Sequence, residues 1–225
     1  MIPARGGSKR IPRKNIRSFL GEPIISYAIR AALKSGLFDE VMVSTDDQEI
    51  ADVARAYGAS VPFMRSADTA NDTATTSAVL LEVTACYQER GRSFPDICCL
   101  YPTTPMVNAQ LLHEAYTLWQ TSQMDALIPV VAFSYPPFRG CIIEGDALKL
   151  RWPEHADTRT QDLPPLYHDA GAFYFIKTEA LINERTLWCK RVAPMVLRDM
   201  QVQDIDCEED WCLAELKYKL LNGGS

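Results

Sequence analysis

The chain has 225 residues, 47% of them hydrophobic, which is enough to bury the core of one large domain. Its 23 basic and 29 acidic residues give a net charge of −6, a balance that argues against a nucleic-acid-binding protein. The sequence has no apolar run of about 18 residues for a membrane span, seven cysteines without a C-x-x-C pair, and three histidines. We therefore expect a reduced, cytoplasmic protein without a zinc site or a membrane contact.

The chain begins with a basic loop at residues 3–15, which reads Pro-Ala-Arg-Gly-Gly-Ser-Lys-Arg-Ile-Pro-Arg-Lys-Asn. Glycines let backbone N–H groups approach a ligand, a serine hydroxyl can donate a hydrogen bond, and lysine and arginine neutralise charge. The loop fits neither the Walker A pattern nor G-x-G-x-x-G. A solvated basic loop is the alternative, but the glycine pair among the charges favours a triphosphate site formed by Arg5, Gly6, Gly7, Ser8, Lys9, Lys14 and Asn15.

Helical patterns and apolar strand-like runs alternate along the next part of the chain. In chain order, we expect a helix at 23–35, a strand at 41–45, a helix at 48–57 capped by Asp46 or Asp47, a strand at 61–64, a helix at 75–90, a strand at 97–101, a helix at 109–120 and a strand at 126–133. This alternation predicts a three-layer α/β/α fold with a mostly parallel sheet. In such a fold a strand precedes the phosphate loop, yet here only Met1 and Ile2 do so.

The alternation breaks at about residue 134, where a proline-rich segment with a hairpin around 144–146 begins. It resumes with a strand at 171–176, a short helix at 178–182 and a closing helix at 207–221. We interpret 1–225 as a single domain that carries an extended segment at about 134–170. That segment is either a recognition surface for an acidic, hydroxyl-rich ligand or an ordinary surface loop, and its polar residues include Arg139, His155, Arg159, Gln161, Tyr167, His168 and Asp169.

A pair of carboxylates, Asp204 and Asp206, lies directly before the closing helix. Side chains at i and i+2 point to the same side of an extended segment, so the pair could hold Mg²⁺, which binds oxygen ligands and substrate phosphates. The alternative is that Asp206 caps the helix.

The run Tyr-Pro-Thr-Thr-Pro at 101–105 follows a buried strand. Ligands of open α/β sheets bind at the carboxyl ends of the strands, where these hydroxyls could face a base or a sugar. A proline-bounded turn explains the run equally well.

Residues 3–15 resemble the signature of the CMP-sugar synthetases, which activate acidic sugars such as sialic acid. The resemblance continues at 43–47, 102–105, 171–174 and 204–206, and it extends over essentially the whole chain. It implies a fold of the nucleotide-diphospho-sugar transferase type and a homodimer formed by the extended segment. It also implies a reaction in which the anomeric hydroxyl of the sugar attacks the α-phosphate of CTP, giving a CMP-sugar and pyrophosphate.

The resemblance assigns roles to single residues. Asp204 and Asp206 would hold Mg²⁺, and the candidate catalytic residues are the cations that stabilise charge as pyrophosphate leaves, namely Arg5, Lys9 and Lys14. The expected nucleotide contacts are Arg5, Gly6, Gly7, Ser8, Lys9, Lys14, Asn15, Pro102 and Thr103. The expected sugar contacts are Tyr101, Arg139, Arg159, Gln161 and His168.

Three positions depart from the sialic acid synthetases. Tyr101 replaces a glutamine, and Thr160 and His168 stand in place of two arginines of the sugar pocket. The runs 133–136, 152–155, 159–164 and 167–171 instead resemble the pseudaminic acid cytidylyltransferases, which activate a related nonulosonic acid used to glycosylate flagellin. We therefore expect pseudaminic acid as the sugar, with sialic, legionaminic or another ulosonic acid as alternatives. A non-catalytic nucleotide-binding or RNA-binding module is the alternative from another class.

Overall fold

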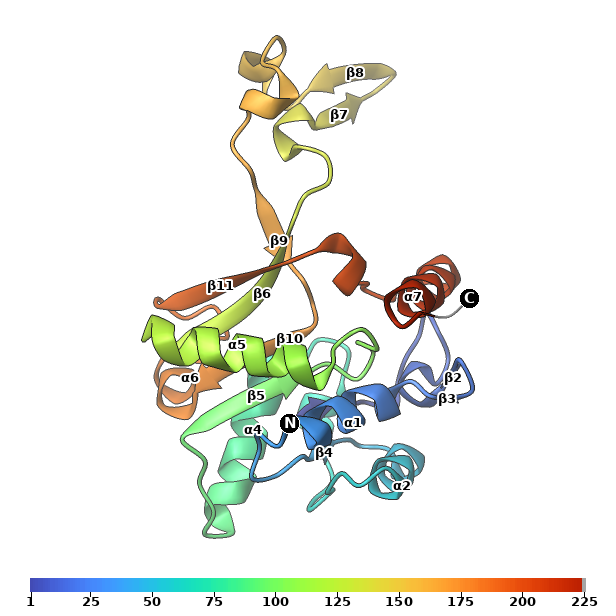
Figure 1. Ribbon diagram of the computed structural model, residues 1–225, viewed down its shortest axis with the longest axis vertical. Coiled ribbons are helices and arrows are strands. Elements are labelled where there is room, and N and C mark those ends of the chain that lie inside the picture. Colours follow the sequence, from blue (N-terminus) through green and yellow to red (C-terminus); the bar gives the residue numbers. More distant parts are fainter. Residues whose placement is uncertain (224–225) are drawn as a thin grey trace.

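The structure, a computed structural model, describes residues 1–223, so the last two residues of the predicted domain lie outside the described part. Its α-helices are α1 (Ile25–Ser35), α2 (Gln48–Ala56), α3 (Ala67–Ala70), α4 (Thr76–Glu89), α5 (Ala109–Ser122), α6 (Thr178–Glu184) and α7 (Glu208–Leu221). Its strands are β1 (Ile2–Pro3), β2 (Ser18–Phe19), β3 (Glu22–Pro23), β4 (Val43–Ser44), β5 (Asp96–Leu100), β6 (Ala126–Ala132), β7 (Cys141–Glu144), β8 (Ala147–Leu150), β9 (Tyr167–Asp169), β10 (Phe173–Lys177) and β11 (Val192–Leu197). Figure 1 shows a rounded body from which one long arm projects.

The central sheet has the strand order β11-β6-β10-β5, with β9 also paired to β6. Strands β6 and β11 are parallel, but β10 runs antiparallel to both β5 and β6, and β9 is antiparallel to β6. The short parallel pair β1–β4 adjoins β5, because the backbone N–H of Leu100 donates to the carbonyl of Met1 (3.0 Å). The prediction of a mostly parallel sheet is therefore wrong, although the fold is a mixed α/β fold.

The antiparallel direction of β9 and β10 arises from the arm. The chain leaves β6, forms the arm, and returns as β9 and then β10 beside the strand that it left, so β6 and β9–β10 are the two sides of one long hairpin (Figure 1). An antiparallel return needs no crossover helix, whereas a parallel one does. The alternation of helices and strands in the sequence cannot reveal that one connection is a hairpin.

Side chains of the three long central strands alternate between two apolar layers. Leu127, Phe173 and Phe175 face a cluster that includes α1 and α5, with Trp119 fully buried in it. Ala126, Tyr174 and Ile176 face the opposite cluster, to which α4 and α6 contribute Leu80 and Leu181. The predicted helix–sheet–helix layering is thus present. A smaller cluster joins α7 to α1 through Phe19, Tyr27 and Trp211.

Most predicted elements are confirmed to within a few residues, and the caps explain their ends. The carboxylate of Asp47 accepts from the N–H of Ile50 (3.1 Å) and begins α2, while Gly36 adopts the left-handed conformation that ends α1. Cys98 and Cys99 are buried in β5, and burial raises the pKa of both thiols to about 12.

Two strand predictions fail at prolines. Residues 61–64 form no strand, because Pro62 lacks an N–H group that could donate to a neighbouring strand. Just before them, Ser60 forms an isolated parallel bridge with Met42, the residue before β4. Conversely, β11 was not predicted, although it pairs with β6 over six residues despite Pro194. Proline is tolerated there because β11 lies at the edge of the sheet.

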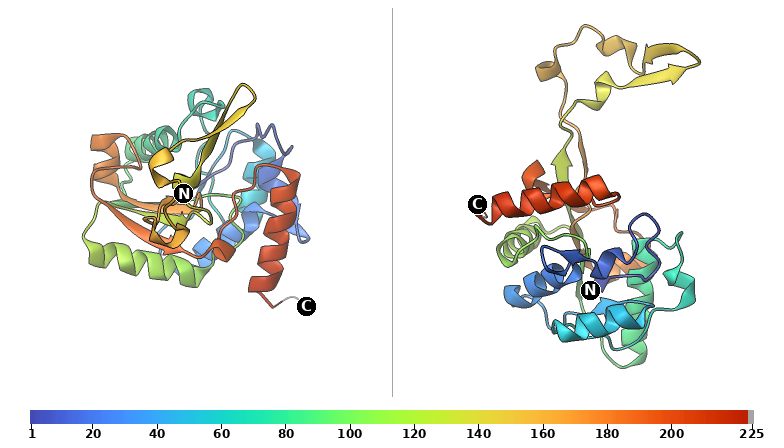
Figure 2. Two further views of the ribbon diagram at one scale, coloured as in Figure 1. Left: turned by 90° about the horizontal axis from the view of Figure 1, so that it is seen from above. Right: turned by 90° about the vertical axis from the view of Figure 1, so that its right-hand side faces the viewer.

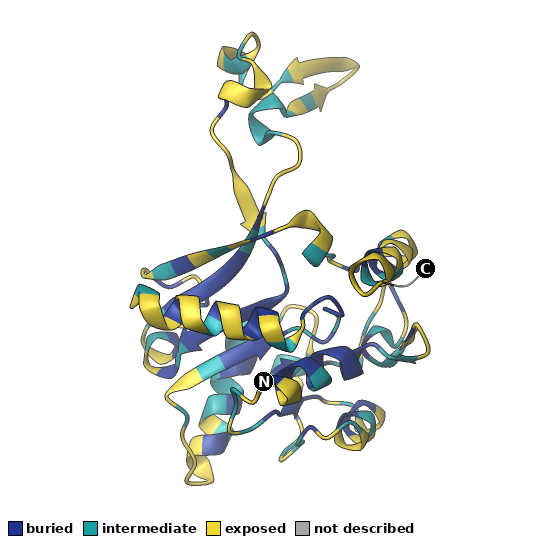
Figure 3. Cartoon of the chain, viewed as in Figure 1, coloured by how far each residue is buried: buried dark blue, intermediate teal, exposed yellow. Residues whose placement is uncertain are grey.

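The arm occupies most of the predicted extended segment and carries the predicted hairpin as β7 and β8 (Figure 1). Viewed from the side, it stands clear of the body (Figure 2). Nearly all of β7 and β8 is exposed (Figure 3), including Ile143 at 78% and Leu148 at 71%. Within residues 1–223, no helix is long and apolar enough to span a membrane.

Candidate active site

A cavity of about 310 Å³ opens at the carboxyl ends of β1 and β5, where open α/β sheets bind ligands. Four segments line it: the basic loop that follows β1, the stretch 65–79 that includes α3 and the start of α4, the turn that follows β5, and the stretch before α7. Nine predicted site residues are among the lining residues, namely Arg5, Ser8, Lys9, Lys14, Asn15, Tyr101, Pro102, Thr103 and Asp204. The fold thus brings together positions that are up to about 200 residues apart in sequence.

Gly6 fixes the first turn of the basic loop against β4. Its backbone N–H donates to Oδ1 of Asp46 (2.9 Å). A side chain at this position would lie 2.7 Å from Oδ2 of Asp47, a distance that no real Cβ contact shows. Glycine is therefore required at position 6 for close packing, whereas Gly7 has open space around it.

Asn15 and Lys14 tie the end of the loop to the rest of the site. The buried amide of Asn15 donates to the carbonyl of Arg5 (2.9 Å), which closes the loop on itself. The ammonium of Lys14 donates to the carbonyl of Ile205 (2.6 Å) and lies 3.7 Å from Oδ1 of Asp206. Lys14 therefore connects the basic loop directly to the carboxylate pair.

The carboxylate pair lies beside the loop cations. Arg10 forms an ion pair with Oδ2 of Asp206 at 2.6 Å. Although the Asp204 side chain is exposed to the open cleft, partial desolvation by the surrounding protein and the nearby charge of Asp206 raise its pKa. A carboxylate whose ionisation is opposed by a neighbouring negative charge is suited to a bound cation.

Asp206 does not cap α7, so this alternative is wrong. The cap position belongs to Cys207, and the carboxylate of Asp210 accepts from the backbone N–H groups of both Asp206 and Cys207 (2.9 Å each). The Asp206 side chain is thereby free of a role in starting the helix.

Tyr101 is held in place beneath the cleft. Its hydroxyl shares a hydrogen bond with Thr76 (2.8 Å), and its ring meets Tyr174 edge-on at 5.4 Å between centroids. The Tyr174 hydroxyl donates to Oδ2 of Asp169 (2.8 Å), whose other oxygen accepts from the N–H of Gly171 (2.8 Å). The floor of the cleft is therefore connected to the base of the arm.

The stretch 65–79 contributes two charged lining residues, Arg65 and Asp72, that were not among the predicted site residues. Arg65 is buried, and its guanidinium donates to the hydroxyl and carbonyl oxygens of Ser44 (3.1 and 2.6 Å) rather than to a carboxylate. Desolvation lowers its pKa. Asp72 forms ion pairs with Arg5 and Lys9. Neither residue belongs to a recognisable motif, so only the tertiary structure identifies them.

Four predicted sugar contacts lie outside the cavity, on the arm or at its base. Arg139 donates to the carbonyls of Ala156 and Thr158 (2.6 and 2.9 Å), which holds the arm together. Arg159 pairs with Asp162 at 2.6 Å, His168 contacts its neighbours in β9, and Gln161 is exposed. Within a single chain these residues do not join the cleft.

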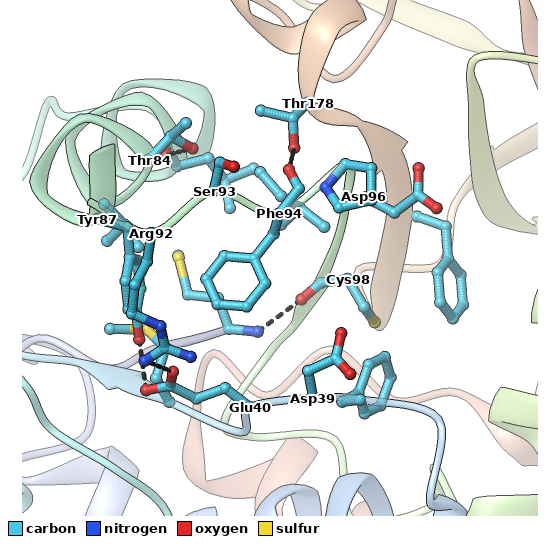
Figure 4. A pocket seen from close by; sticks show the side chains of 18 of the residues that line it. Asp39, Glu40, Thr84, Tyr87, Arg92, Ser93, Phe94, Asp96, Cys98 and Thr178 are labelled. Carbon is cyan, nitrogen blue, oxygen red and sulfur yellow. Dashed lines mark hydrogen bonds and ion pairs between the residues drawn. The ribbon is translucent and has the colours of Figure 1, made fainter. Parts of the chain in front are cut away.

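A second cavity, of about 280 Å³, lies at the opposite ends of the strands (Figure 4). It opens where β1 begins, and the terminal amine of Met1 donates to the carbonyl of Cys98 (2.7 Å). Figure 4 shows Glu40, Tyr87 and Arg92 gathered on one side of it. None of the predicted site residues lines this cavity, so we place the active site at the first one.

The overall fold is shared with known nucleotidyltransferases. A solved structure of CMP:2-keto-3-deoxy-manno-octonic acid synthetase complexed with CTP superimposes with a TM-score of 0.68, covering 99% of this chain and 97% of that one at 18% identity. A likeness at this identity defines the fold alone.

The sequence matches the Cytidylyltransferase family over residues 1–205, and the chain belongs to this family. It is 42% identical to the pseudaminic acid cytidylyltransferase of Campylobacter jejuni serotype O:2, over 98% of this chain and 95% of that protein. It is 32% identical to the CMP-N,N'-diacetyllegionaminic acid synthase of Legionella pneumophila, again over 98% and 95%. The resemblance inferred from the motifs is confirmed.

Proposed function

We propose that this protein transfers CMP from CTP to the anomeric hydroxyl of pseudaminic acid. The anomeric oxygen bonds to the α-phosphorus as the bond from that phosphorus to the bridging oxygen of the β-phosphate breaks. Pyrophosphate leaves with the electron pair of that bond, and the hydroxyl proton passes to solvent. The name of the Campylobacter relative, at 42% identity over nearly the full length, supports pseudaminic acid over legionaminic acid.

The single observation that carries the proposal is the meeting of the basic loop and the Asp204–Asp206 segment at one cavity. Lys14 bridges them through its bond to the carbonyl of Ile205. A nucleoside triphosphate needs cations for its phosphates and, beside them, carboxylates for the divalent ion that accompanies it. A purely structural basic loop would not place its lysine against a carboxylate pair in an open cleft.

The loop residues take the charged part of the nucleotide. Arg5 and Lys9 bind the phosphates, the Ser8 hydroxyl donates to one of their oxygens, and Lys14 stabilises the charge that grows as pyrophosphate departs. The loop lets its backbone approach the phosphates at Gly6 and Gly7, and it is closed on itself at Asn15. Another part of the wall is formed by Pro102 and Thr103. The buried guanidinium of Arg65 adds a cation at the cavity wall.

The donor set fits Mg²⁺. Asp204 and Asp206 supply oxygen ligands, and Mg²⁺ commonly binds one or two carboxylates together with substrate phosphates and water. When bound, the ion would polarise the α-phosphate and favour the deprotonated sugar hydroxyl. Residues 1–223 contain no group of three or more His, Cys, Asp or Glu that could hold a metal ion, so the phosphates would have to complete the coordination.

The arm supports a homodimer. Its exposed apolar side chains, Tyr135, Ile143 and Leu148, are each more than 70% exposed and have no cover within their own chain. In a two-fold dimer the arm of one subunit could reach the cleft of the other, which would give Arg139, Arg159, Gln161 and His168 access to the sugar carboxylate.

Replacing both Ile143 and Leu148 by Asp should convert the dimer to a monomer, because the substitution puts charge into the apolar contact. Light scattering after size exclusion measures the mass. The matched control is Ile182→Asp, which changes a half-exposed isoleucine on α6 and should leave the mass unchanged. A double variant that keeps the mass of the parent contradicts the proposed interface.

The function is tested by incubating the protein with CTP, Mg²⁺ and a panel of pseudaminic, legionaminic and sialic acids while pyrophosphate release is followed. We expect turnover with pseudaminic acid. Turnover with one of the other acids alone would keep the reaction and change the sugar. CTP binding without turnover of any sugar would instead favour a non-catalytic nucleotide-binding protein.

A further inference from the structure

Asp72 occupies the mouth of the cleft, in the short connection between α3 and α4. Its two carboxylate oxygens are used separately: Oδ1 pairs with Arg5 and Oδ2 pairs with Lys9. One anion therefore bridges the first two cations of the basic loop. A phosphate group, with several oxygens on one centre, binds a pair of cations in the same manner.

The connection that carries Asp72 is built as a defined turn. The side-chain oxygen of Asn71 accepts from the backbone N–H of Thr73 (2.9 Å) and from its hydroxyl (2.7 Å). The Asn71 amide donates to the carbonyl of Asp68 (2.7 Å). These bonds hold the turn from both sides, so Asp72 projects toward the loop from a fixed base.

The remaining loop cations at the site are paired in a different way. Arg10 and Lys14 face Asp206, a carboxylate whose charge a divalent ion would share. Asp72 stands on the other side of the basic loop, and its charge stays uncompensated once a polyanion takes Arg5 and Lys9. If ligand phosphates and the Asp72 carboxylate contacted these two cations at the same time, the phosphates and the carboxylate would repel each other.

We propose that Asp72 is an internal competitor for the phosphates: it holds Arg5 and Lys9 when the site is empty, and the nucleotide must displace it. This inference rests on the proposed function, since it takes Arg5 and Lys9 as the phosphate-binding cations. Binding displaces the Asp72 carboxylate from the two cations. As pyrophosphate leaves, the carboxylate recovers both cations, so Asp72 lowers the affinity for the triphosphate and speeds the release of the product.

The test uses Asp72→Asn and the matched control Asp68→Asn, which removes the same charge from an exposed residue four positions earlier. Binding of inorganic pyrophosphate is measured by calorimetry at low ionic strength without Mg²⁺, so that Asp204 and Asp206 contribute no bridging ion. We expect Asp72→Asn to bind pyrophosphate about 3- to 10-fold more tightly, since two exposed ion pairs no longer compete. Asp68→Asn should match the parent.

A second ligand separates competition from a general change in the cleft. Cytidine lacks phosphates, so its affinity should be the same for the parent and for Asp72→Asn, whereas CTP should follow pyrophosphate. Equal or weaker pyrophosphate binding by Asp72→Asn overturns the inference, as does an equal gain in Asp68→Asn. Tighter pyrophosphate binding in a protein that shows no CTP turnover would uphold the role of Asp72 and refute the proposed function.

Discussion

Asp206→Asn should reduce the rate of pyrophosphate release from CTP and sugar by at least about 100-fold, with the protein still folded. The carboxylate contacts Arg10 and lies near Lys14, so it links the loop cations to the proposed ion. An amide halves the negative charge available to Mg²⁺ at the pair. We therefore expect the residual activity to need more Mg²⁺ than the parent does, as measured by titrating Mg²⁺ at saturating CTP.

The structure supplies a matched control for this loss four residues further on, in α7. The Asp210 carboxylate accepts from the N–H groups at the start of α7. In Asp210→Asn the amide oxygen can still accept these bonds, so only the lost negative charge at the helix N-terminus should lower the free energy of unfolding, by about 0.3–1 kcal/mol. Its turnover per folded molecule should stay near that of the parent. If Asp206→Asn keeps the Mg²⁺ dependence and turnover of the parent, the metal assignment is wrong.

Lys14→Met should lower kcat by about 10²–10³-fold, equivalent to about 2.7–4 kcal/mol of transition-state stabilisation. Lys14 donates a hydrogen bond to the backbone of the Asp204–Asp206 segment, and in the proposed mechanism its charge lies where the α- and β-phosphates separate. Methionine keeps the length and apolar stem of the side chain but not the charge. Single-turnover kinetics with CTP and pseudaminic acid would measure the chemical step.

The control for Lys14→Met is Lys34→Met, an exposed lysine in the last turn of α1. It makes the same chemical change far from the cleft and should leave kcat unchanged. A Lys14→Met protein that is folded and within tenfold of the parent rate would rule out the role of Lys14 in stabilising the leaving group.

Local sequence was sufficient for the longer helices and for nine of the residues that line the first cavity. Asp47 and Gly36 mark helix ends through their own side-chain and backbone preferences, which act within a few residues. The glycine pair among cations in 3–15 and the spacing of Asp204 and Asp206 likewise carry their chemistry in neighbouring positions. The family comparison agrees with these motifs.

Pairing between distant strands was not predictable in the same way. The direction of β10 depends on the return of the chain from the arm. The apolar pattern of a strand is the same whether the strand runs parallel or antiparallel to its neighbours. Residues 61–64 and β11 both contain proline. Only the tertiary structure decides that β11 pairs with β6 as an edge strand, whereas residues 61–64 form no strand.

The sequence by itself determined the family, the longer helices, and the positions of the basic loop and the carboxylate pair, because each rests on residues that are close together in the chain. The tertiary structure alone decided that Asp206 is free of the α7 cap, that Arg65 lies buried at the cleft, and that Asp72 holds two loop cations. These features depend on contacts between segments far apart in sequence, and such contacts leave no periodic or spaced pattern in the chain.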